Sequence, residues 1–328
     1  MEIFTLKNHA DEPFTFLTLG DPHFKVNNVA QSKEMTTAFI KLAKELNPDF
    51  IINMGDTLHN HEKIHVTVLC NANDFLRELS KIAPLFVLIG NHDRANNTVF
   101  MNDVHPFNGL KGQNNITIVD EPKLWNYKGL MLGFIPYVSP GRFNEAVGNS
   151  HFDIIFAHQE FKGSMLNTNI KSKNGDIFHR SIVISGHIHS RHRLKNIYYV
   201  GTPMQQSFGE MGEKTVSLFT VCGNKLAEKR YDLGLTRRFN VTIDVKEAET
   251  YERLNDGIYK IIIRDIKSKL DTFRYHQNRA ILMRGGLVSF VIIREKIEIK
   301  IIHGNFTDNL REQANKAERK LLEEILRS

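Results

Sequence analysis

Short apolar runs, each followed by polar residues, recur through the first 232 residues and restrict the possible folds more than any other feature of this chain. Seven runs have the length and composition of buried strands, and they occupy residues 14–19, 50–54, 84–89, 116–119, 130–135, 152–157 and 181–185. Residues 33–46 and 66–82 instead carry apolar side chains at helical spacing. Strands that alternate with helices predict an α/β protein built on a sheet core.

The pattern changes near Leu233 and Gly234, which we interpret as a domain boundary. Residues 1–234 form the predicted α/β domain. Residues 235–305 contain longer, β-branched strand runs and are expected to form a smaller α+β domain. Within 306–328, one face of an amphipathic C-terminal helix is marked by Leu310, Ala314, Ala317, Leu321 and Ile325.

Composition places the chain among globular proteins of a reducing compartment. Hydrophobic residues make up 41% and charged residues 24% of its 328 residues, and no apolar run approaches the roughly 20 residues that span a bilayer. The N-terminus has no basic region followed by a long hydrophobic stretch. Cys70 and Cys222 lie far apart without metal-type spacing. We therefore expect an intracellular protein with no membrane association.

The net charge of +6 is unevenly distributed, because residues 235–328 contain 19 Lys and Arg against 14 Asp and Glu. A basic face there would suit a polyanionic partner such as nucleic acid. A charged, solvated surface would give the same count, and charge alone leaves both interpretations open.

Five of the strand runs are followed by residues of the same kind, namely Asp, Asn and His. Gly-Asp-Pro-His follows the first run, Gly-Asp-Thr-Leu-His the second and Gly-Asn-His-Asp the third, while His158 and then Gly-His-Ile-His follow the last two. A single His or Asp after a strand is usually a turn residue or a helix cap. Five in this order are hard to obtain by chance, so they predict a common site at one edge of the sheet core.

Carboxylate, amide oxygen and imidazole are ligands that suit manganese, iron or zinc, and the absence of thiolates argues against a structural zinc site. The candidate ligands are Asp21, His23, Asp56, Asn91, His158, His187 and His189. Seven ligands exceed what one ion uses, whereas two ions sharing a bridging carboxylate account for the number. Such ion pairs stabilise the attacking and leaving oxygens of a phosphoryl displacement.

The order DxH, GDxxx, GNHD, His, GHxH resembles the signature of the calcineurin-like metallophosphoesterases over roughly residues 14–189. The resemblance implies a β-sandwich flanked by helices in four layers, α/β/β/α, with residues 235–305 as a cap. It also implies that Asp21, His23, Asp56 and His189 hold one ion and that Asp56, Asn91, His158 and His187 hold the other, so that Asp56 bridges. The nucleophile would be a metal-bound hydroxide.

The same resemblance assigns His92 to catalysis rather than to metal binding. In the family this histidine supplies a proton to the leaving oxygen or supports the charge that develops there. Asp93 would then hold His92 in orientation.

Two features resemble the SbcD and meiotic-recombination-eleven type of DNA double-strand-break nuclease within this family. His59 lies three residues after the bridging aspartate, and in archaeal and eukaryotic members the equivalent histidine contacts the DNA phosphate near the metals. The stretch YYVGTPMQQSFGE, residues 198–210, is similar to the segment that closes the nuclease domain. Protein serine/threonine phosphatases differ, because they carry an arginine-containing GDYVDRG and GNHE where this chain has GDTLHNHE and GNHD.

The resemblance thus implies a manganese-preferring DNA nuclease of the repair type, acting as an exonuclease or single-strand endonuclease. Expected partners are DNA, a second copy of the chain and an SbcC-type ATPase, which the terminal helix would grip unless it packs on its own domain. Residues considered for DNA contact are Arg191, Lys267, Lys269, Arg274 and Arg279. A polar turn is the simplest role for Arg191, and for the other four a solvated helix or loop is an equal alternative.

Two other interpretations of the function remain. The chain could hydrolyse small phosphodiesters or phosphomonoesters, or it could be a non-catalytic DNA-binding subunit. His61 and His65 lie close to His59, yet as solvent-facing residues they need no function.

Overall fold

The chain divides into two compact units, Met1–Arg238 and Phe239–Ser328. The computed structural model describes residues 3–61, 63–166, 170–210, 212–251, 257–266, 269–270 and 287–295. The division lies close to the boundary predicted at residue 234. The predicted C-terminal helix at 306–328 lies outside the described residues, so the division into three parts stays a prediction.

The first unit contains a seven-stranded sheet with the order β1-β13-β12-β2-β3-β4-β5. Its strands are β1 (Ile3–Thr5), β2 (Phe14–Leu19), β3 (Phe50–Asn53), β4 (Leu85–Leu88), β5 (Ile116–Val119), β12 (Val216–Cys222) and β13 (Lys225–Tyr231). β2, β3, β4 and β5 are parallel. β12 pairs antiparallel with both β2 and β13, so a segment from late in the unit completes the sheet that the first strands begin.

A second, six-stranded sheet of this unit has the order β10-β11-β9-β8-β7-β6. Its strands are β6 (Lys123–Tyr127), β7 (Leu130–Ile135), β8 (Ile154–His158), β9 (Ile182–Gly186), β10 (His192–Leu194) and β11 (Ile197–Tyr199). The strands β7, β8, β9 and β11 are parallel, whereas β6 and β10 close the two edges in the antiparallel sense.

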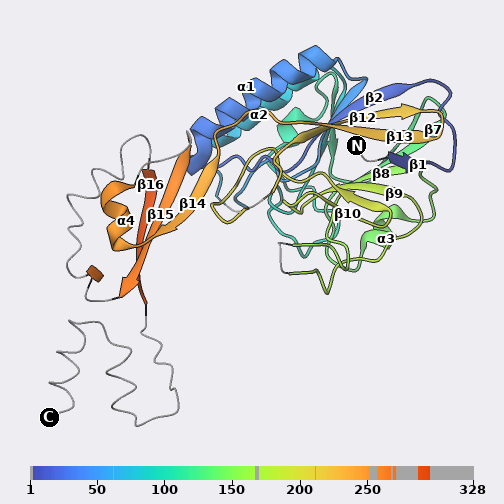
Figure 1. Cartoon of the computed structure of the whole chain (residues 1–328). Helices are drawn as coiled ribbons and strands as arrows, with labels where there is room; N and C mark the ends of the chain where they lie inside the picture. Colours follow the sequence, from blue (N-terminus) through green and yellow to red (C-terminus); the bar gives the residue numbers. More distant parts are fainter. Residues whose placement is uncertain are drawn as a thin grey trace, which may run out of the picture. The chain divides into compact units, whose positions relative to one another are not determined.

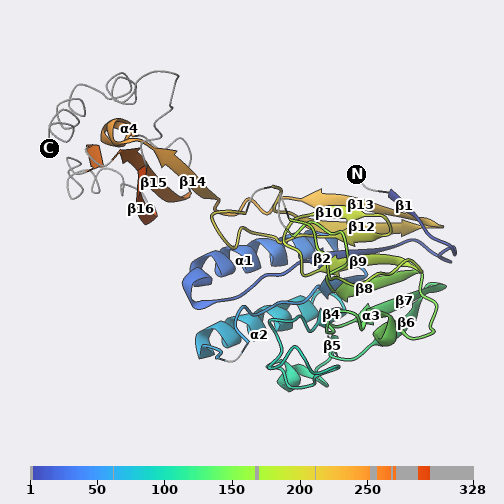
Figure 2. The ribbon, with the colours of Figure 1, turned by 90° about the horizontal axis from the view of Figure 1, so that it is seen from below.

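The helices α1 (Val29–Leu46) and α2 (Val66–Ser80) lie side by side against the seven-stranded sheet (Figures 1 and 2). Met35, Phe39 and Ala43 recur every four residues on the buried face of α1, which is why the segment forms an amphipathic helix. The shorter helices are η1 (Val26–Asn28), η2 (Asn108–Leu110) and α3 (Phe143–Val147). Within the described part of the chain, no helix combines the length and apolar character that a membrane crossing requires.

Alternating side chains of the central strands serve two different cores, which explains their continuous apolar sequences. On β2, Phe16 packs between the two sheets while Leu17 packs beneath the helices. Phe50 and Ile51 of β3 divide in the same way. The outer face of the second sheet is covered by α3 and by loop residues, including Phe161. The layers are therefore helix, sheet, sheet and helix, and the predicted fold class is confirmed.

The second unit has a three-stranded sheet in the order β14-β15-β16. Its elements are β14 (Arg238–Ile243), α4 (Val245–Thr250), β15 (Ile258–Ile266) and β16 (Leu287–Glu295), of which β15 and β16 are parallel. Asp244 caps α4, because its carboxylate accepts the backbone N–H of Glu247 and the Glu247 carboxylate accepts that of Asp244. The described elements of this unit include both a helix and strands, and the assignment of residues 235–305 to an α+β domain stays a prediction.

Candidate metal centre

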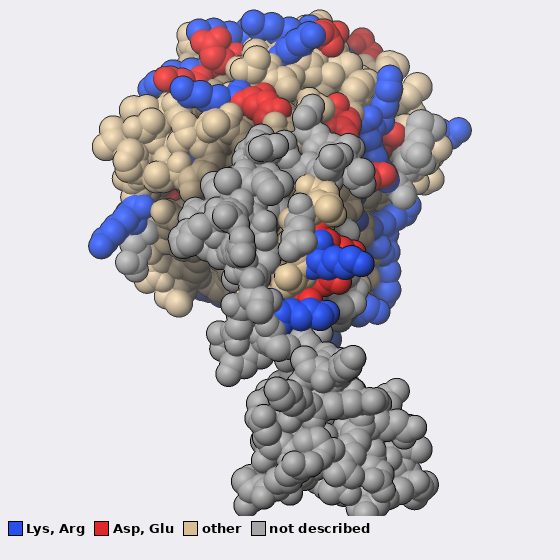
Figure 3. All heavy atoms as spheres, turned by 60° about the vertical axis from the view of Figure 1, so that its left-hand side comes forward, with Lys and Arg blue, Asp and Glu red and all other residues tan. Residues whose placement is uncertain are grey.

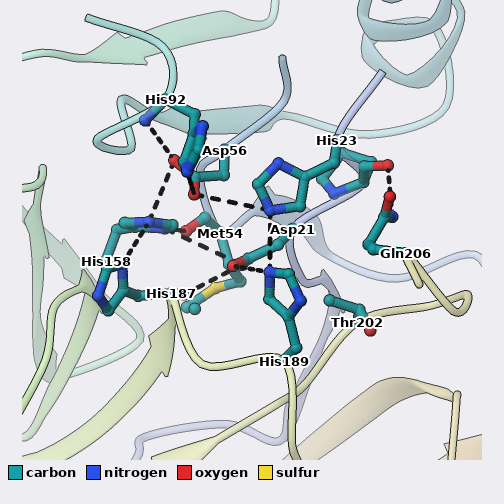
Figure 4. Close-up of polar contacts among 12 residues, drawn as sticks. Asp21, His23, Met54, Asp56, His92, His158, His187, His189, Thr202 and Gln206 are labelled. Atoms are coloured by element: carbon teal, nitrogen blue, oxygen red, sulfur yellow. Dashed lines mark hydrogen bonds and ion pairs between the residues drawn. The ribbon is translucent and has the colours of Figure 1, made fainter. Parts of the chain in front are cut away.

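The ends of strands from both sheets bring the predicted ligands together. Loops after β2, β3 and β4 carry Asp21, His23, Asp56 and Asn91, while β8 ends in His158 and the loop after β9 carries His187 and His189. Figure 4 labels all of these residues except Asn91, and the labelled side chains point toward one another. The site therefore exists only where the two sheets pack against each other.

Among the described residues, three groups have potential ligand atoms that all lie within 4.8 Å of one another, and the group of His23, His59 and His92 contains no carboxylate. The first of the two clusters that contain a carboxylate consists of Asp21, His23 and His189. Nε2 of His23 lies 2.9 Å from Nε2 of His189, and the latter lies 4.0 Å from Oδ2 of Asp21. Two imidazole nitrogens and a carboxylate oxygen thus converge on one small volume.

The second cluster consists of Asp56, His158 and His187, to which Asn91 adds an amide oxygen. Oδ1 of Asn91 lies 2.8 Å from Nδ1 of His187 and 3.1 Å from Nε2 of His158. Nδ1 of His158 donates to the carbonyl oxygen of Met54 over 2.8 Å, which leaves Nε2 facing the cluster.

Asp56 connects the two clusters. Its Oδ1 lies 3.2 Å from Nε2 of His158 in the second cluster, and its Oδ2 lies 3.8 Å from Nε2 of His23 in the first. One carboxylate therefore presents one oxygen to each cluster, which is the arrangement expected of a bridging ligand.

The loops hold this geometry through backbone conformations that are uncommon for their residue types. Asp56, at a φ of 48°, and His187, at a φ of 78°, lie in the left-handed region. A Cβ on Gly90 would lie 2.2 Å from Oδ1 of Asp56 and 2.3 Å from its backbone nitrogen, so only glycine allows the third loop to approach the second. The Gly-Asp and Gly-Asn pairs in the sequence reflect this close contact.

Two observations show that a divalent cation fits here. Oδ2 of Asp21 is buried and has no hydrogen-bond partner among the described residues, which is costly for a carboxylate. Burial alone would lower the pKa of His158, yet Asp56 and Asp21 raise it to about 9. Burial likewise opposes ionisation of Asp56, but His158 and His23 hold its pKa well below the usual range. The site thus concentrates negative charge that attracts a cation, and its oxygen and nitrogen donors suit divalent metals.

The three histidines beyond the clusters form a stack. His92 lies between His59 and His61, with ring centroids 5.4 Å and 4.4 Å away. Nδ1 of His92 donates to the carbonyl oxygen of His59 over 2.6 Å, and its Nε2 lies 4.0 Å from Oδ2 of Asp56. Nδ1 of His59 lies 3.4 Å from Nδ1 of His23. Burial is the main reason that the pKa of His92 lies below its ordinary value, although Asp56 opposes the shift.

Asp93 does not orient His92 in the way expected from the sequence. Its Oδ1 accepts the backbone N–H of Leu58 at 2.8 Å, and its Oδ2 accepts those of Thr57 and Gly90 at 3.1 Å each. Burial and then the nearby Asp56 raise the pKa of Asp93 to about 7. The carboxylate therefore ties the second loop to the third, while the backbone of His59 contacts the ring of His92.

Arg191 does not reach the surface as a DNA contact would require, so this expectation is wrong. Its side chain is 5% exposed and forms an ion pair with Glu228 at 2.5 Å. It also donates to the hydroxyls of Tyr198 and Ser217. In the second unit, Lys269 pairs with Asp265 at 3.2 Å. The remaining candidates lie outside the described residues: Lys267, Arg274 and Arg279.

Several residues near the clusters were not identified from the sequence. Glu210 lies 2.7 Å from Nδ1 of His189 and is held by Lys214, and Oε2 of Glu160 lies 3.8 Å from Nε2 of His187. Glu210 is the last residue of the stretch YYVGTPMQQSFGE, whose similarity to the nuclease segment indicates no role for this carboxylate. His61 was interpreted as a residue without function, yet it covers one face of His92.

An open depression of about 760 Å³ begins at the histidine stack. It is lined by His59, Asn60, His61, Lys63, Ala95, Asn96 and Asn97, from the loops after β3 and β4. These side chains offer hydrogen bonds and one positive charge, and none of the seven is acidic. The described lining of the depression is therefore mainly polar and carries one positive charge.

Comparison with known proteins agrees with this chemistry. A family model for calcineurin-like phosphoesterases matches residues 14–191. Phosphoesterase 244L of Invertebrate iridescent virus 6 is 39% identical over 276 residues, which are 79% of this chain and 96% of that protein. Phosphoesterase 078R of Invertebrate iridescent virus 3 is 33% identical over 294 residues, 84% of each chain. Both names mark the activity as inferred.

Among solved structures, one match is entitled "GAP50 the anchor in the inner membrane complex of Plasmodium". It has a TM-score of 0.44 and 15% identity, and the match covers 84% of this chain and 96% of that one.

Proposed function

Because this chain belongs to the calcineurin-like phosphoesterase family, we propose that it hydrolyses phosphodiesters with two divalent metal ions bound at the two clusters. Phosphoester hydrolysis follows from the family, and the restriction to diesters is our proposal. The observation that carries it is Asp56, whose two carboxylate oxygens face one cluster each. A diester has a substituent on either side of the phosphorus, and the depression beside the clusters provides room for one of them.

In this proposal Asp21, His23, His189 and Asp56 hold one ion, and Asp56, Asn91, His158 and His187 hold the other. Two such ions would supply a water of lowered pKa as nucleophile and offset charge on the attacking and leaving oxygens. Manganese is the ion we expect, because carboxylate, amide and imidazole donors suit it and no thiolate is among the proposed ligands.

His92 assists departure of the leaving oxygen. Its Nδ1 is fixed by the carbonyl of His59, so Nε2 faces Oδ2 of Asp56 between the clusters. In the protonated ring, which carries a hydrogen on both nitrogens, Nε2 can give a proton to the leaving oxygen or stabilise its developing charge. His59 supports His23 through the contact between their Nδ1 atoms.

DNA is a second, more specific candidate for the substrate, and the depression favours it. A strand of DNA continues past the scissile phosphate, and Lys63 with the neighbouring amides and imidazoles could bind the next part of its backbone. The outer surface offers less support, since Lys and Arg lie beside Asp and Glu along the top and the right-hand side of the face in Figure 3. An SbcC-type ATPase partner and a homodimer remain predictions.

Hydrolysis assays with purified protein test both levels of this proposal. Bis-p-nitrophenyl phosphate and end-labelled single- and double-stranded DNA would be incubated with manganese, magnesium or chelator. Asp56→Ala removes the bridging carboxylate, and Asp74→Ala, at an exposed position of α2, serves as the matched control.

Cleavage of the small diester that needs manganese and Asp56 is the expected result. If DNA is cut under the same requirements, the nuclease candidate stands; if DNA stays intact, the substrate is a small phosphodiester. Absence of hydrolysis of every diester by folded, metal-loaded protein would overturn the proposal.

A further inference from the structure

The histidines of the two clusters are not supported in the same way. Nδ1 of His189 donates to Oε1 of Glu210 over 2.7 Å, so Nε2 is the ring nitrogen that faces His23 and Asp21. In the second cluster, Nδ1 of His158 donates to the neutral carbonyl of Met54. Glu160 also lies near the second cluster, but its Oε2 is 3.8 Å from Nε2 of His187, beyond hydrogen-bond distance. Among the described residues, a carboxylate outside the ligand set is therefore hydrogen-bonded to a histidine of the first cluster, whereas the second cluster has a neutral carbonyl and a more distant carboxylate.

Glu210 is itself held firmly. Its Oε2 accepts Nζ of Lys214 at 2.7 Å and the backbone N–H of Gln206 at 3.0 Å. The side chain of Lys214 is 3% exposed, and its Nζ also donates to the hydroxyl of Thr202 at 2.7 Å. A buried lysine that reaches three oxygens fixes the carboxylate more rigidly than a solvated one would.

The path of the chain explains why this pair is specific to the first cluster. Lys214 also lies 3.4 Å from the backbone carbonyl of His189, so it touches both the ligand and the carboxylate that orients it. Gln206 extends the support, because its Nε2 donates to the carbonyl of Pro22, between Asp21 and His23. The segment from Thr202 to Lys214 therefore contacts two of the loops that form the first cluster.

We propose that Glu210, anchored by Lys214, is a positioning residue that fixes His189 and thereby sets the metal affinity of the Asp21–His23–His189 cluster. The cluster of Asp56, His158 and His187 keeps its affinity independently of this pair. The inference rests on the metal binding proposed above and adds to it a difference between the two ions.

Calorimetric titration of the metal-free full chain with Mn²⁺ tests this. Wild type should bind two ions. In Glu210→Ala one of the two binding steps should weaken by about 10–100-fold while the other is unchanged. Glu210→Gln keeps an acceptor oxygen and should recover part of the lost affinity, and Lys214→Met should weaken the same step less than Glu210→Ala does.

Glu213→Gln is the matched control, because Glu213 is 62% exposed and pairs with Arg230 rather than with a ligand. Thermal unfolding of each metal-free variant shows whether it is folded, and Glu210→Gln carries the test if Glu210→Ala is not.

Two binding steps of wild-type affinity in folded Glu210→Ala would overturn this inference and leave the proposed function intact. Equal weakening of both steps would overturn it as well, because it requires one cluster to be affected. If wild type binds no Mn²⁺ at all, both this inference and the two-metal proposal fail.

Discussion

At the level of single residues, Asp21 is the part of the site that most needs a cation. Its Oδ2 has no hydrogen-bond partner among the described residues, and burial raises its pKa above the ordinary value. A buried carboxylate oxygen without a hydrogen bond destabilises the folded protein, and a bound ion would remove that cost.

Metal removal should therefore lower the stability of the protein. Mn²⁺ at a hundred times its dissociation constant should raise the free energy of unfolding by about 2.7 kcal/mol per site, measured by thermal unfolding against chelator. Asp21→Asn should be at least as stable as wild type in chelator but should gain less from Mn²⁺. An equal gain in both proteins would show that Asp21 is not a ligand.

His92→Gln should slow hydrolysis of bis-p-nitrophenyl phosphate by about 10²–10⁴-fold while the bound metal stays at the wild-type amount. The reason is that His92 faces the space between the clusters but belongs to neither of the two proposed ligand sets. The measurement is kcat together with metal content, with the exposed His65→Gln as control. Loss of metal from His92→Gln would place His92 among the ligands.

The sequence predicted the residues of the site better than their supports. Asp56 and His158 could be located because each follows an apolar strand, and parallel strands deliver their ends to one edge. Glu210 could not be located in this way, because it belongs to an irregular segment and no sequence pattern indicates that this segment passes beside His189. Arg191 was misplaced for a similar reason, since nothing local indicates that its buried partner Glu228 comes from β13.

At the level of elements, strands buried on both faces were the predictable ones. β3 and β4 read as uninterrupted apolar runs because helices cover one face and the second sheet covers the other. β6 was not predicted, because it is an edge strand whose residues are partly or fully exposed along its length. β10 and β11 are three residues each, too short for a periodic pattern.

A buried polar network joins the two sheets, and it predicts a stability effect. Arg191 precedes β10 of one sheet, while Ser217 and Glu228 belong to β12 and β13 of the other. Glu228→Gln leaves the buried guanidinium of Arg191 without its counter-charge and should lower the free energy of unfolding by roughly 3–5 kcal/mol. Denaturant unfolding measures this, with Glu213→Gln as an exposed control. A change as small as that of the control would contradict the role of the network.

The same pair should give a pH dependence. Burial opposes ionisation of Glu228, but Arg191 and hydrogen bonds from Ser217 and Tyr198 hold its pKa below the ordinary 4.5. A carboxyl group whose pKa is lower in the folded state than in the unfolded state stabilises the folded protein fully at a pH above the unfolded-state pKa. This stabilisation is lost as the pH falls through the folded-state pKa. The difference between wild type and Glu228→Gln should thus be constant near neutrality and shrink in acid. A difference that grew in acid would contradict this sign.

At the level of the whole molecule, both metal clusters and the depression belong to the first compact unit. Residues 1–238 alone should therefore bind two Mn²⁺ ions and hydrolyse bis-p-nitrophenyl phosphate at the wild-type rate. DNA cleavage should fall if the second unit is the DNA-positioning cap predicted from the sequence. Calorimetry and parallel assays on both substrates would check this, and loss of Mn²⁺ binding by the folded fragment would contradict it.

The order of strands in the seven-stranded sheet has a consequence for biosynthesis. β2, which leads into the first ligands, pairs with β12 near the end of the unit. His158, His187 and His189, with the supporting Glu210, also emerge from the ribosome long after Asp21 and Asp56. A nascent chain that has just released its first carboxylates cannot yet enclose an ion. The protein should thus acquire its metals only after most of the unit has been translated, and the metal that it carries will reflect the compartment in which that final step takes place.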